Sequence, residues 1–431
     1  MKILVVGAGG REHALVWKLH QSPMGKEILC APGNPGTAEI ARSVPIDPAS
    51  ILELASFAAA NRVDLTVIGP EIPLALGAAA EFEKRGLKVF GARRAAAEIE
   101  SSKIFAKEFM LRHSIPTAPF TVHDDPEDAR RAIGARRRFP VVIKADGLAA
   151  GKGVLIAGSR EEALSAIDLC MEEKRFGPAG ERILIEDFLR GQETSFFALT
   201  DGERLLPLAT CCDYKAVWEG DRGPNTGGMG SFSPSPLPDE KTCRWIMDRI
   251  LAPTVAGLAR ESRPYRGILY AGLMLTEAGP KVLEFNARFG DPETQVLLPR
   301  MKSDLLPLLL DCAGGSLEGK QVEWNREAAV CVVLASEGYP EKPLAGKIIE
   351  WRKGSEASPD LLFFHAGTQQ DGDGTLRSAG GRVINVVGSG TDLREARARA
   401  YAGVEAVHFQ GMHFRSDIAL ERTATAETST G

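Results

Sequence analysis

Residues 282–294 read VLEFNARFGDPET, and this stretch says most about the fold and the chemistry of the chain. Because successive side chains of a β-strand point to opposite faces, a strand here would place Glu284, Asn286 and Arg288 on one face. A carboxylate, an amide oxygen and a guanidinium in a row suit a hard cation and a transferring phosphoryl group, although an ordinary strand with one solvated face has the same pattern. The polar turn Gly-Asp-Pro-Glu-Thr that follows favours a ligand site. The other face of the strand would be apolar, formed by Leu283, Phe285, Ala287 and Phe289.

A glycine-rich loop lies between two short apolar runs in residues 140–154, which read PVVIKADGLAAGKGV. Its small side chains let backbone N–H groups approach phosphate oxygens closely, and Lys144 and Lys152 flank the glycines. It is not a P-loop, because Gly153 follows the lysine where that motif requires Ser or Thr. The order strand, glycine loop, strand predicts a flap over a nucleotide, and a plain flexible hairpin is the alternative.

A third stretch, residues 183–197, reads ILIEDFLRGQETSFF and is typical of a strand that runs into a linker. Such a linker could offer backbone groups and an apolar wall to an adenine ring. Glu193 would suit a ribose hydroxyl, although acidic residues at a strand end are commonly just solvated.

The first hundred residues alternate between strand and helix patterns. This rhythm predicts a mostly parallel sheet covered on both faces, with a ligand crevice at the carboxyl ends of its strands. The glycines at 7–10 suggest a dinucleotide fold, but Glu12 stands where G-x-G-x-x-G needs its last glycine. A phosphate at the helix N-terminus, helped by Arg11, is the preferred prediction. The expected strands are 2–6, 27–30, 64–68 and 87–90, and the expected helices are 11–20 and 74–85.

Two further units are expected after the first. Pro116 and Pro119 mark a linker, and residues 126–138 have a helical pattern. Residues 221–238 are rich in glycine and proline, which predicts an irregular loop that covers a substrate. The last unit is expected to contain strands at 328–334, 361–365 and 382–387 and a helix at 392–407.

The composition is that of an ordinary globular protein, with 25% charged and 44% hydrophobic residues among 431. The net charge of −5 argues against a nucleic-acid partner. Seven scattered cysteines without a C-x-x-C pair suggest reduced thiols, and the scattered histidines make a zinc site improbable. No apolar run approaches the ~18 residues that span a bilayer, and residues 1–10 suggest a strand rather than a signal peptide. A cytoplasmic enzyme is expected.

Together these stretches resemble the ATP-grasp superfamily, in which two lobes grip ATP, and within it the phosphoribosylamine–glycine ligase family. The chain departs from the family at Ala8, where Asn or Ser is usual, and at Tyr214 and Ala216, where Asp-His-Lys-Arg becomes Asp-Tyr-Lys-Ala. The motifs that carry the resemblance are GAGGREHA (7–14), APGNPGTA (31–38), GPE (69–71), SSKIFAKEFM (101–110), IKADGLAAGKGV (143–154), GPNTGGMGSFSP (223–234), LYAGLM (269–274), LEFNARFGDPETQ (283–295) and HAGT (365–368).

The resemblance implies an α/β and α+β fold with three domains. They would be an N-terminal parallel βαβ domain (1–102) for the phosphoribosylamine substrate, a two-lobed ATP-grasp domain (103–325) with its small lobe at about 120–197, and a small α/β C-terminal domain (326–421). A disordered tail (422–431) would follow them.

The implied reaction joins glycine to 5-phosphoribosylamine through glycyl phosphate, using ATP and Mg²⁺ or Mn²⁺. Glu284 and Asn286 would bind the metal, and Arg288 would stabilise the transferring phosphoryl group, with Asp213 and Lys215 as further catalytic candidates. ATP would be held by Lys103, Lys144, Gly147, Gly151, Lys152, Gly153, Glu186, Leu189 and Glu193. The other substrates would meet Gly9, Gly10, Arg11, Asp291, Glu293 and Thr294.

Three other functions compete with this interpretation. A carboxylase of the same superfamily would share the ATP lobes but require bicarbonate. The N-terminal glycines alone suggest an NAD-linked oxidoreductase, and the departures at Tyr214 and Ala216 would fit a non-catalytic nucleotide sensor. Only small-molecule partners are expected, with no nucleic acid and no membrane, and the chain is expected to be a monomer or at most a weak dimer.

Overall fold

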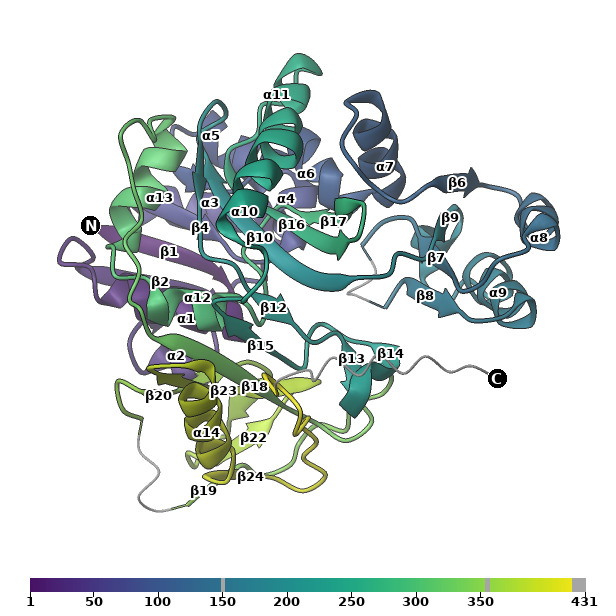
Figure 1. Ribbon diagram of the computed structural model, residues 1–431. Coiled ribbons are helices and arrows are strands. Elements are labelled where there is room, and N and C mark those ends of the chain that lie inside the picture. Colours follow the sequence, from purple (N-terminus) through teal and green to yellow (C-terminus); the bar gives the residue numbers. More distant parts are fainter. Residues whose placement is uncertain (149–151, 353–356, 421–431) are drawn as a thin grey trace.

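The computed structural model describes residues 1–148, 152–352 and 357–420. Figure 1 shows a small lobe, with strands from β6 (Phe120–His123) to β9 (Ile183–Asp187), that projects to the right of the main body, and the region around α14 (Leu393–Val404) and β23 (Arg382–Gly390) below that body. Within these ranges no helix is long and apolar enough to cross a membrane. The predicted disordered tail lies outside the described residues.

A five-stranded parallel sheet forms the N-terminal region, in the order β3-β2-β1-β4-β5. All residues of β1 except Lys2 are buried, as expected for a parallel strand with helices over both faces, so the predicted sheet is confirmed. The strands are β1 (Lys2–Gly7), β2 (Glu27–Pro32), β3 (Arg42–Ser43), β4 (Leu65–Ile68) and β5 (Val89–Phe90). The helices are α1 (Gly10–His20), α2 (Pro35–Ala38), α3 (Ile51–Ala60), α4 (Glu71–Leu76), α5 (Ala78–Lys84) and α6 (Arg94–Ser101).

The single helix predicted at 74–85 was wrong, because two helices occupy this region. Gly77 ends α4 with a φ of +93°, a left-handed conformation that favours glycine, and α5 begins at the next residue. The apolar pattern runs through the break, since Leu74, Ala78 and Phe82 belong to the same core.

The small lobe is a four-stranded antiparallel sheet in the order β6-β9-β7-β8, with its own apolar core. The predicted strands on both sides of the glycine loop are present and pair with each other, and the helix predicted at 126–138 ends at Ala135. Its elements are α7 (Lys103–Arg112), which leads into the lobe, β6 (Phe120–His123), α8 (Pro126–Ala135), β7 (Val141–Ala145), β8 (Val154–Ala157), α9 (Arg160–Ile167), short turns at Asp168–Glu172 and Gly177–Gly180, and β9 (Ile183–Asp187).

The larger lobe is built on a four-stranded antiparallel sheet in the order β11-β10-β16-β17. Its strands are β10 (Gln192–Thr200), β11 (Leu205–Pro207), β16 (Gly267–Thr276) and β17 (Gly279–Asn286). The associated helices are α10 (Glu240–Ile246), η4 (Met247–Leu251), α11 (Ala252–Arg260), α12 (Thr294–Arg300) and α13 (Leu305–Gly314).

A β-bulge in β17 corrects the predicted apolar face. Gly272 pairs with Glu284 but Leu273 pairs with Val282, so Leu283 is an extra residue in the strand. Leu283 is therefore only half-buried, and Val282 takes its place in the core. Phe285, Ala287 and Phe289 are buried as predicted.

A third sheet has the order β12-β15-β18-β23-β20 and joins strands from both sides of residue 325. The prediction that residues 221–238 are irregular was wrong, because β14 and β15 lie there and β15 pairs with the long buried strand β18. The elements of this region are β12 (Cys212–Asp213), β13 (Ala216–Trp218), η3 (Glu219–Asp221), β14 (Arg222–Asn225), β15 (Gly230–Ser233), β18 (Ala328–Ala335), β19 (Glu350–Trp351), β20 (Leu361–His365), β21 (Thr368–Gln370), β22 (Leu376–Ser378), β23 (Arg382–Gly390), α14 (Leu393–Val404) and β24 (Val407–His408).

Candidate active site

A cavity of about 390 Å³ lies where the small lobe, the larger lobe, the N-terminal sheet and the third sheet meet. Most of the residues predicted for the site line this cavity. They are Arg11, Lys103, Lys144, Gly147, Gly153, Glu186, Leu189, Glu193, Asp213, Lys215, Glu284, Asn286, Arg288, Asp291 and Glu293.

Several predicted site residues do not line the wall. Thr294 is buried behind it, where its hydroxyl donates to the carbonyl oxygen of Gly290 at 2.5 Å and closes the turn before α12. Lys152 is exposed. Gly9 and Gly10 lie at the start of α1 beside the cavity, and Gly151 lies outside the described residues.

Glu284, Asn286 and Arg288, which the sequence predicted on one face of a strand, all line the cavity. Lys215 Nζ lies 3.1 Å from Glu284 Oε1, and chiefly this charge lowers the pKa of Glu284 to about 2. Arg288 lies just after the strand and donates from Nη2 to Asn286 Oδ1 at 3.2 Å. Glu284 and Asn286 therefore offer an ionised carboxylate oxygen and an amide oxygen on the wall of the same cavity.

Two carboxylates that sequence reasoning missed hold Arg288. Glu71 accepts from Arg288 Nε at 3.1 Å, and Glu100 Oε1 lies 3.1 Å from Nη2. Burial alone would raise the pKa of Glu71, but Arg288 and Arg11 bring it down to about 2. Glu71 belongs to the GPE motif, which is a signal for it, whereas nothing local marks Glu100.

Glu284 and Asn286 fit a divalent cation. In the described part of the chain no group of three or more His, Cys, Asp or Glu side chains could hold a metal alone. The two oxygen ligands would therefore be completed by phosphate oxygens and water, which is the usual manner of Mg²⁺ binding.

Lysines gather at the small-lobe end of the cavity, which we call the phosphate end. Glu186 is almost fully buried and pairs with Lys107 at 2.9 Å and with Lys144 at 3.1 Å. Lys144 also donates to the carbonyl oxygen of Leu283 at 3.0 Å, and Lys103 donates to that of Gly147 at 2.7 Å.

Lys107 is a further residue that the sequence reasoning missed. Lys103 and Lys107 are four residues apart and therefore lie on one face of α7. This spacing is the sequence signal that could have identified Lys107 as a site residue. Burial lowers the pKa of Lys107 to about 8, although Glu186 opposes this shift.

Acidic side chains surround Lys215 in the middle of the cavity. Burial raises the pKa of Asp213 to about 8, against the opposing effect of Lys215. Glu193 lies 4.0 Å from Lys215 Nζ. Glu293 accepts from the Tyr270 hydroxyl at 2.6 Å.

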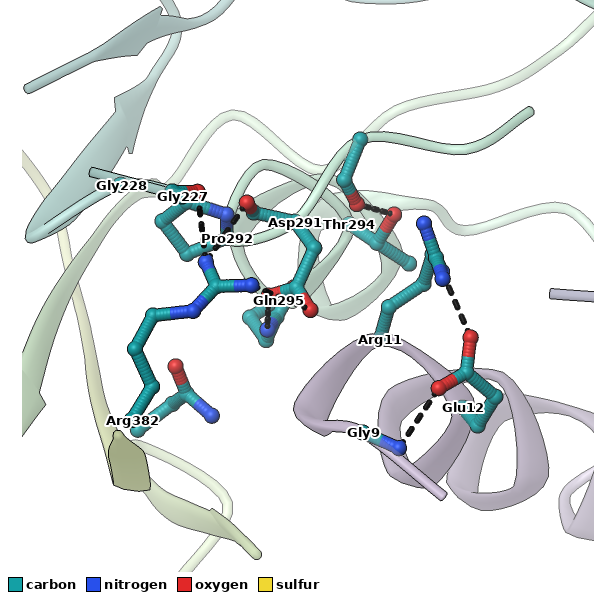
Figure 2. A network of polar contacts seen from close by, with 12 residues as sticks. Gly9, Arg11, Glu12, Gly227, Gly228, Asp291, Pro292, Thr294, Gln295 and Arg382 are labelled. Atoms are coloured by element: carbon teal, nitrogen blue, oxygen red, sulfur yellow. Dashed lines mark hydrogen bonds and ion pairs between the residues drawn. The ribbon is translucent and has the colours of Figure 1, made fainter. Parts of the chain in front are cut away.

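The opposite end, which we call the acceptor end, gathers residues from three distant parts of the chain around Asp291 (Figure 2). Arg11 donates to Glu12 Oε1 at 2.6 Å and to the carbonyl oxygen of Phe289 at 3.1 Å. Arg382 lies 3.0 Å from Asp291 Oδ2 and was not predicted, since no local pattern marks it. This end presents two guanidinium groups beside the N-terminus of α1.

Gly10 lets α1 approach the third sheet. A Cβ atom there would lie 2.1 Å from Nδ2 of Asn385 and 2.8 Å from Nε2 of Gln295, so these side chains or the helix would have to shift. The glycine pattern at the start of α1 therefore serves close packing as well as any ligand contact.

Comparison with known proteins identifies three matching family models. They are the phosphoribosylglycinamide synthetase N domain over residues 1–100, its ATP-grasp (A) domain over 101–294 and its C domain over 329–421. A phosphoribosylamine–glycine ligase from Caldanaerobacter subterraneus subsp. tengcongensis is 48% identical over 97% of this chain and 99% of the relative.

Solved structures show the same relationship. The crystal structure of a phosphoribosylamine–glycine ligase from Thermotoga maritima is 35% identical, covers 97% of this chain and 100% of that chain, and has a TM-score of 0.84. A biotin carboxylase domain from Hydrogenobacter thermophilus, solved with MgADP and bicarbonate, shares the fold with a TM-score of 0.73 at 17% identity, over 96% of this chain and 91% of that one.

Proposed function

The chain belongs to the phosphoribosylglycinamide synthetase family, and from this premise we propose how its cavity carries out the family's reaction. The enzyme joins glycine to 5-phosphoribosylamine and converts ATP to ADP and phosphate, which yields glycinamide ribonucleotide for purine biosynthesis. A carboxylate is a poor electrophile, so glycine is first phosphorylated to glycyl phosphate. The amine then attacks the activated carbonyl carbon, the bond from this carbon to the phosphate oxygen breaks, and phosphate leaves.

The phosphate end is proposed to bind ATP. Lys103, Lys107 and Lys144 offer positive charge in a buried cleft, where it acts more strongly on phosphate than in water. Gly147, Lys152 and Gly153 belong to the loop proposed to close over the phosphates. The adenosine would lie against Leu189 and the end of β9, with Glu193 towards the ribose. Because Lys107 and Lys144 both form ion pairs with Glu186, this carboxylate is proposed to hold the two lysines in place rather than to contact the nucleoside.

Glu284 and Asn286 are proposed to hold Mg²⁺ or Mn²⁺ together with phosphate oxygens. When bound, the cation neutralises charge on the phosphates. Arg288 stands beside them, fixed by Glu71 and Glu100, and is proposed to stabilise the equatorial oxygens of the transferring phosphoryl group. Lys215 and Asp213 complete the catalytic set.

The acceptor end is proposed to bind phosphoribosylamine and glycine. The N-terminus of α1 at Gly9 and Gly10, with the Arg11 guanidinium, suits the sugar phosphate. Asp291 and Glu293 face the cavity and are proposed to contact the amine groups. Thr294 is proposed to shape the turn without touching substrate.

All three substrates are proposed to bind in one cavity lined by residues of a single chain, which supports a monomer as the active form. The seven cysteines are free, as expected in a reducing compartment, and this supports a cytoplasmic location.

The observation that carries the proposal is the single cavity with a lysine-lined end, a paired Glu284–Asn286 site and an arginine-lined end. Release of ADP from ATP should be measured with glycine alone, with phosphoribosylamine alone and with both. Steady release is expected only with both substrates. Steady turnover with bicarbonate in place of glycine would instead support a carboxylase and overturn the assignment.

A further inference from the structure

Arg382 carries a charged group from the C-terminal segment into the cavity. It is the first residue of β23, and it lines the cavity on the other side of Asp291 from Arg11 (Figure 2). The residues it approaches belong to the central segment, far away in the sequence.

Its guanidinium joins two loops. Nη1 donates to the carbonyl oxygen of Gly227 at 2.6 Å and to that of Asp291 at 2.8 Å. Nη2 lies 3.0 Å from the Asp291 carboxylate. Two nitrogens of a planar guanidinium reach these three acceptors from separate positions, whereas a lysine has all its donors on one nitrogen and would not replace this geometry.

A second glycine-rich segment, at Gly227 and Gly228, is packed directly on this guanidinium. A Cβ atom on Gly227 would lie 3.0 Å from Arg382 Cζ, and one on Gly228 would lie 2.3 Å from Pro292. Gly227 N also donates to the Tyr339 hydroxyl at 2.9 Å. The loop and the turn thus meet around Arg382 with no room for larger side chains.

Asp291 is held from two sides by these contacts. Arg382 pairs with Oδ2, while Gln295 Nε2 donates to Oδ1 at 2.7 Å. Burial alone would raise the pKa of Asp291, but the charges of Arg382 and Arg11 outweigh burial and hold the pKa below its usual value, so the carboxylate is ionised. An ionised and oriented carboxylate at the acceptor end can accept a hydrogen bond from an amine.

We propose that Arg382 is a positioning residue that orients Asp291 towards the amine of phosphoribosylamine, so that this amine, and not water, consumes glycyl phosphate. The proposal rests on the acceptor end assigned above. When the amine is misplaced, a water oxygen attacks the glycyl carbonyl carbon, the carbon–oxygen bond to phosphate breaks, and glycine, phosphate and a proton are released. ATP is then spent without product.

The test is the ratio of ADP to glycinamide ribonucleotide formed, together with KM for each substrate. Arg382→Met should lower kcat/KM for phosphoribosylamine by ~10²-fold, the scale of a small misplacement of reacting groups. The ratio should rise clearly above one, while KM for ATP stays within about twofold. Arg382→Lys should behave like Arg382→Met, and added guanidinium ion should bring the ratio of Arg382→Met back towards one.

Gly227→Ala provides an independent variant that keeps the charge. Its new Cβ atom would press on Arg382 from the loop side, so the ratio should rise in the same direction by a smaller amount. If Arg382→Met does not fold, Gly227→Ala still tests the proposal.

Arg415→Met is the matched control. Arg415 is a buried arginine of the same C-terminal segment, and it donates to the carbonyl oxygen of Ala216 at 3.0 Å and pairs with Asp221, outside the cavity wall. Its loss should lower the melting temperature and leave the ratio at one. The proposal would be overturned if the ratio of ADP to glycinamide ribonucleotide stayed at one in both Arg382→Met and Gly227→Ala. It would also be overturned if kcat/KM fell equally for all three substrates. Absence of wild-type turnover with glycine and phosphoribosylamine would instead overturn the assigned function.

Discussion

The two ends of the cavity are assembled in different ways. The phosphate end draws Lys103, Lys144 and Glu186 from one continuous stretch of chain that forms α7 and the small lobe. The acceptor end brings together Arg11, Asp291 and Arg382, which lie on three separate regions of the fold. The first end can be recognised from local motifs, whereas the second exists only when distant segments pack together. Substitutions that weaken contacts between these segments should therefore impair the acceptor end more than the phosphate end.

Arg288 lies between the two ends, and its loss should have the largest effect. In Arg288→Met, kcat should fall by ~10²- to 10³-fold, the scale for one preorganised stabiliser of transition-state charge. The partly exposed Glu71 and the nearly buried Glu100 would also lose their partner, so the free energy of unfolding should fall by about 3 kcal/mol, the lower end of the range for a buried pair. Steady-state rates and thermal melts check both effects. A variant that melts early but keeps its rate would make Arg288 purely structural.

Lys144→Met tests whether the phosphate end acts separately from the acceptor end. Removing one partner of a buried charge pair across a binding interface, here the proposed contact of Lys144 with an ATP phosphate, commonly costs about 2–5 kcal/mol, so ATP binding should weaken by ~30-fold or more. KM for phosphoribosylamine should stay near the wild-type value. Calorimetric titration with nucleotide and steady-state kinetics measure the two quantities. An equal rise in both KM values would show that the ends are not independent.

Acid should weaken the contact between the N-terminal and C-terminal segments through two buried histidines. The backbone N–H of His365 donates to His13 Nδ1 at 2.9 Å, and burial lowers the pKa of His13 to about 3 and that of His365 to about 4. Between pH 6.5 and about 4 the unfolded chain binds protons that the folded protein excludes. Stability should thus be full above pH 6.5 and fall with acidification, by up to about 1.4 kcal/mol per pH unit for each histidine.

Urea unfolding at pH 7 and pH 5 measures this slope. His13→Gln should roughly halve the histidine contribution, because one of the two groups is removed. An unchanged slope in His13→Gln would mean that other groups, such as carboxylates, dominate the acid response.

The smallest effects are expected for substitutions at the bulge in β17, where Val282 and not Leu283 belongs to the core. Val282 is fully buried, so Val282→Ala should cost about 2 kcal/mol of stability with little change in KM. Leu283 is half-buried and lines the cavity, so Leu283→Ala should cost less than about 1 kcal/mol but raise KM for ATP. Melting curves and kinetics of the two variants test the bulge. If the strand alternated regularly, Leu283→Ala would be the less stable variant.

Sequence alone determined the features that depend on neighbouring residues. Period-two alternation predicted that Glu284, Asn286 and Arg288 would meet, and the repeated strand–helix rhythm predicted the parallel N-terminal sheet. The glycine loop between two strands was likewise evident from its composition. These are local properties, because side-chain direction in a strand and backbone freedom at glycine are set within a few residues.

Only the tertiary structure decided the rest. The bulge at Leu283 depends on register with β16, and the order in residues 221–238 depends on pairing of β15 with β18. The partners of Arg288 and of Asp291 come from segments that no local pattern connects. Strand register and buried ion pairs are fixed by which surfaces face one another after folding, and a charged residue shows no sign in its own neighbourhood of the partner it will meet.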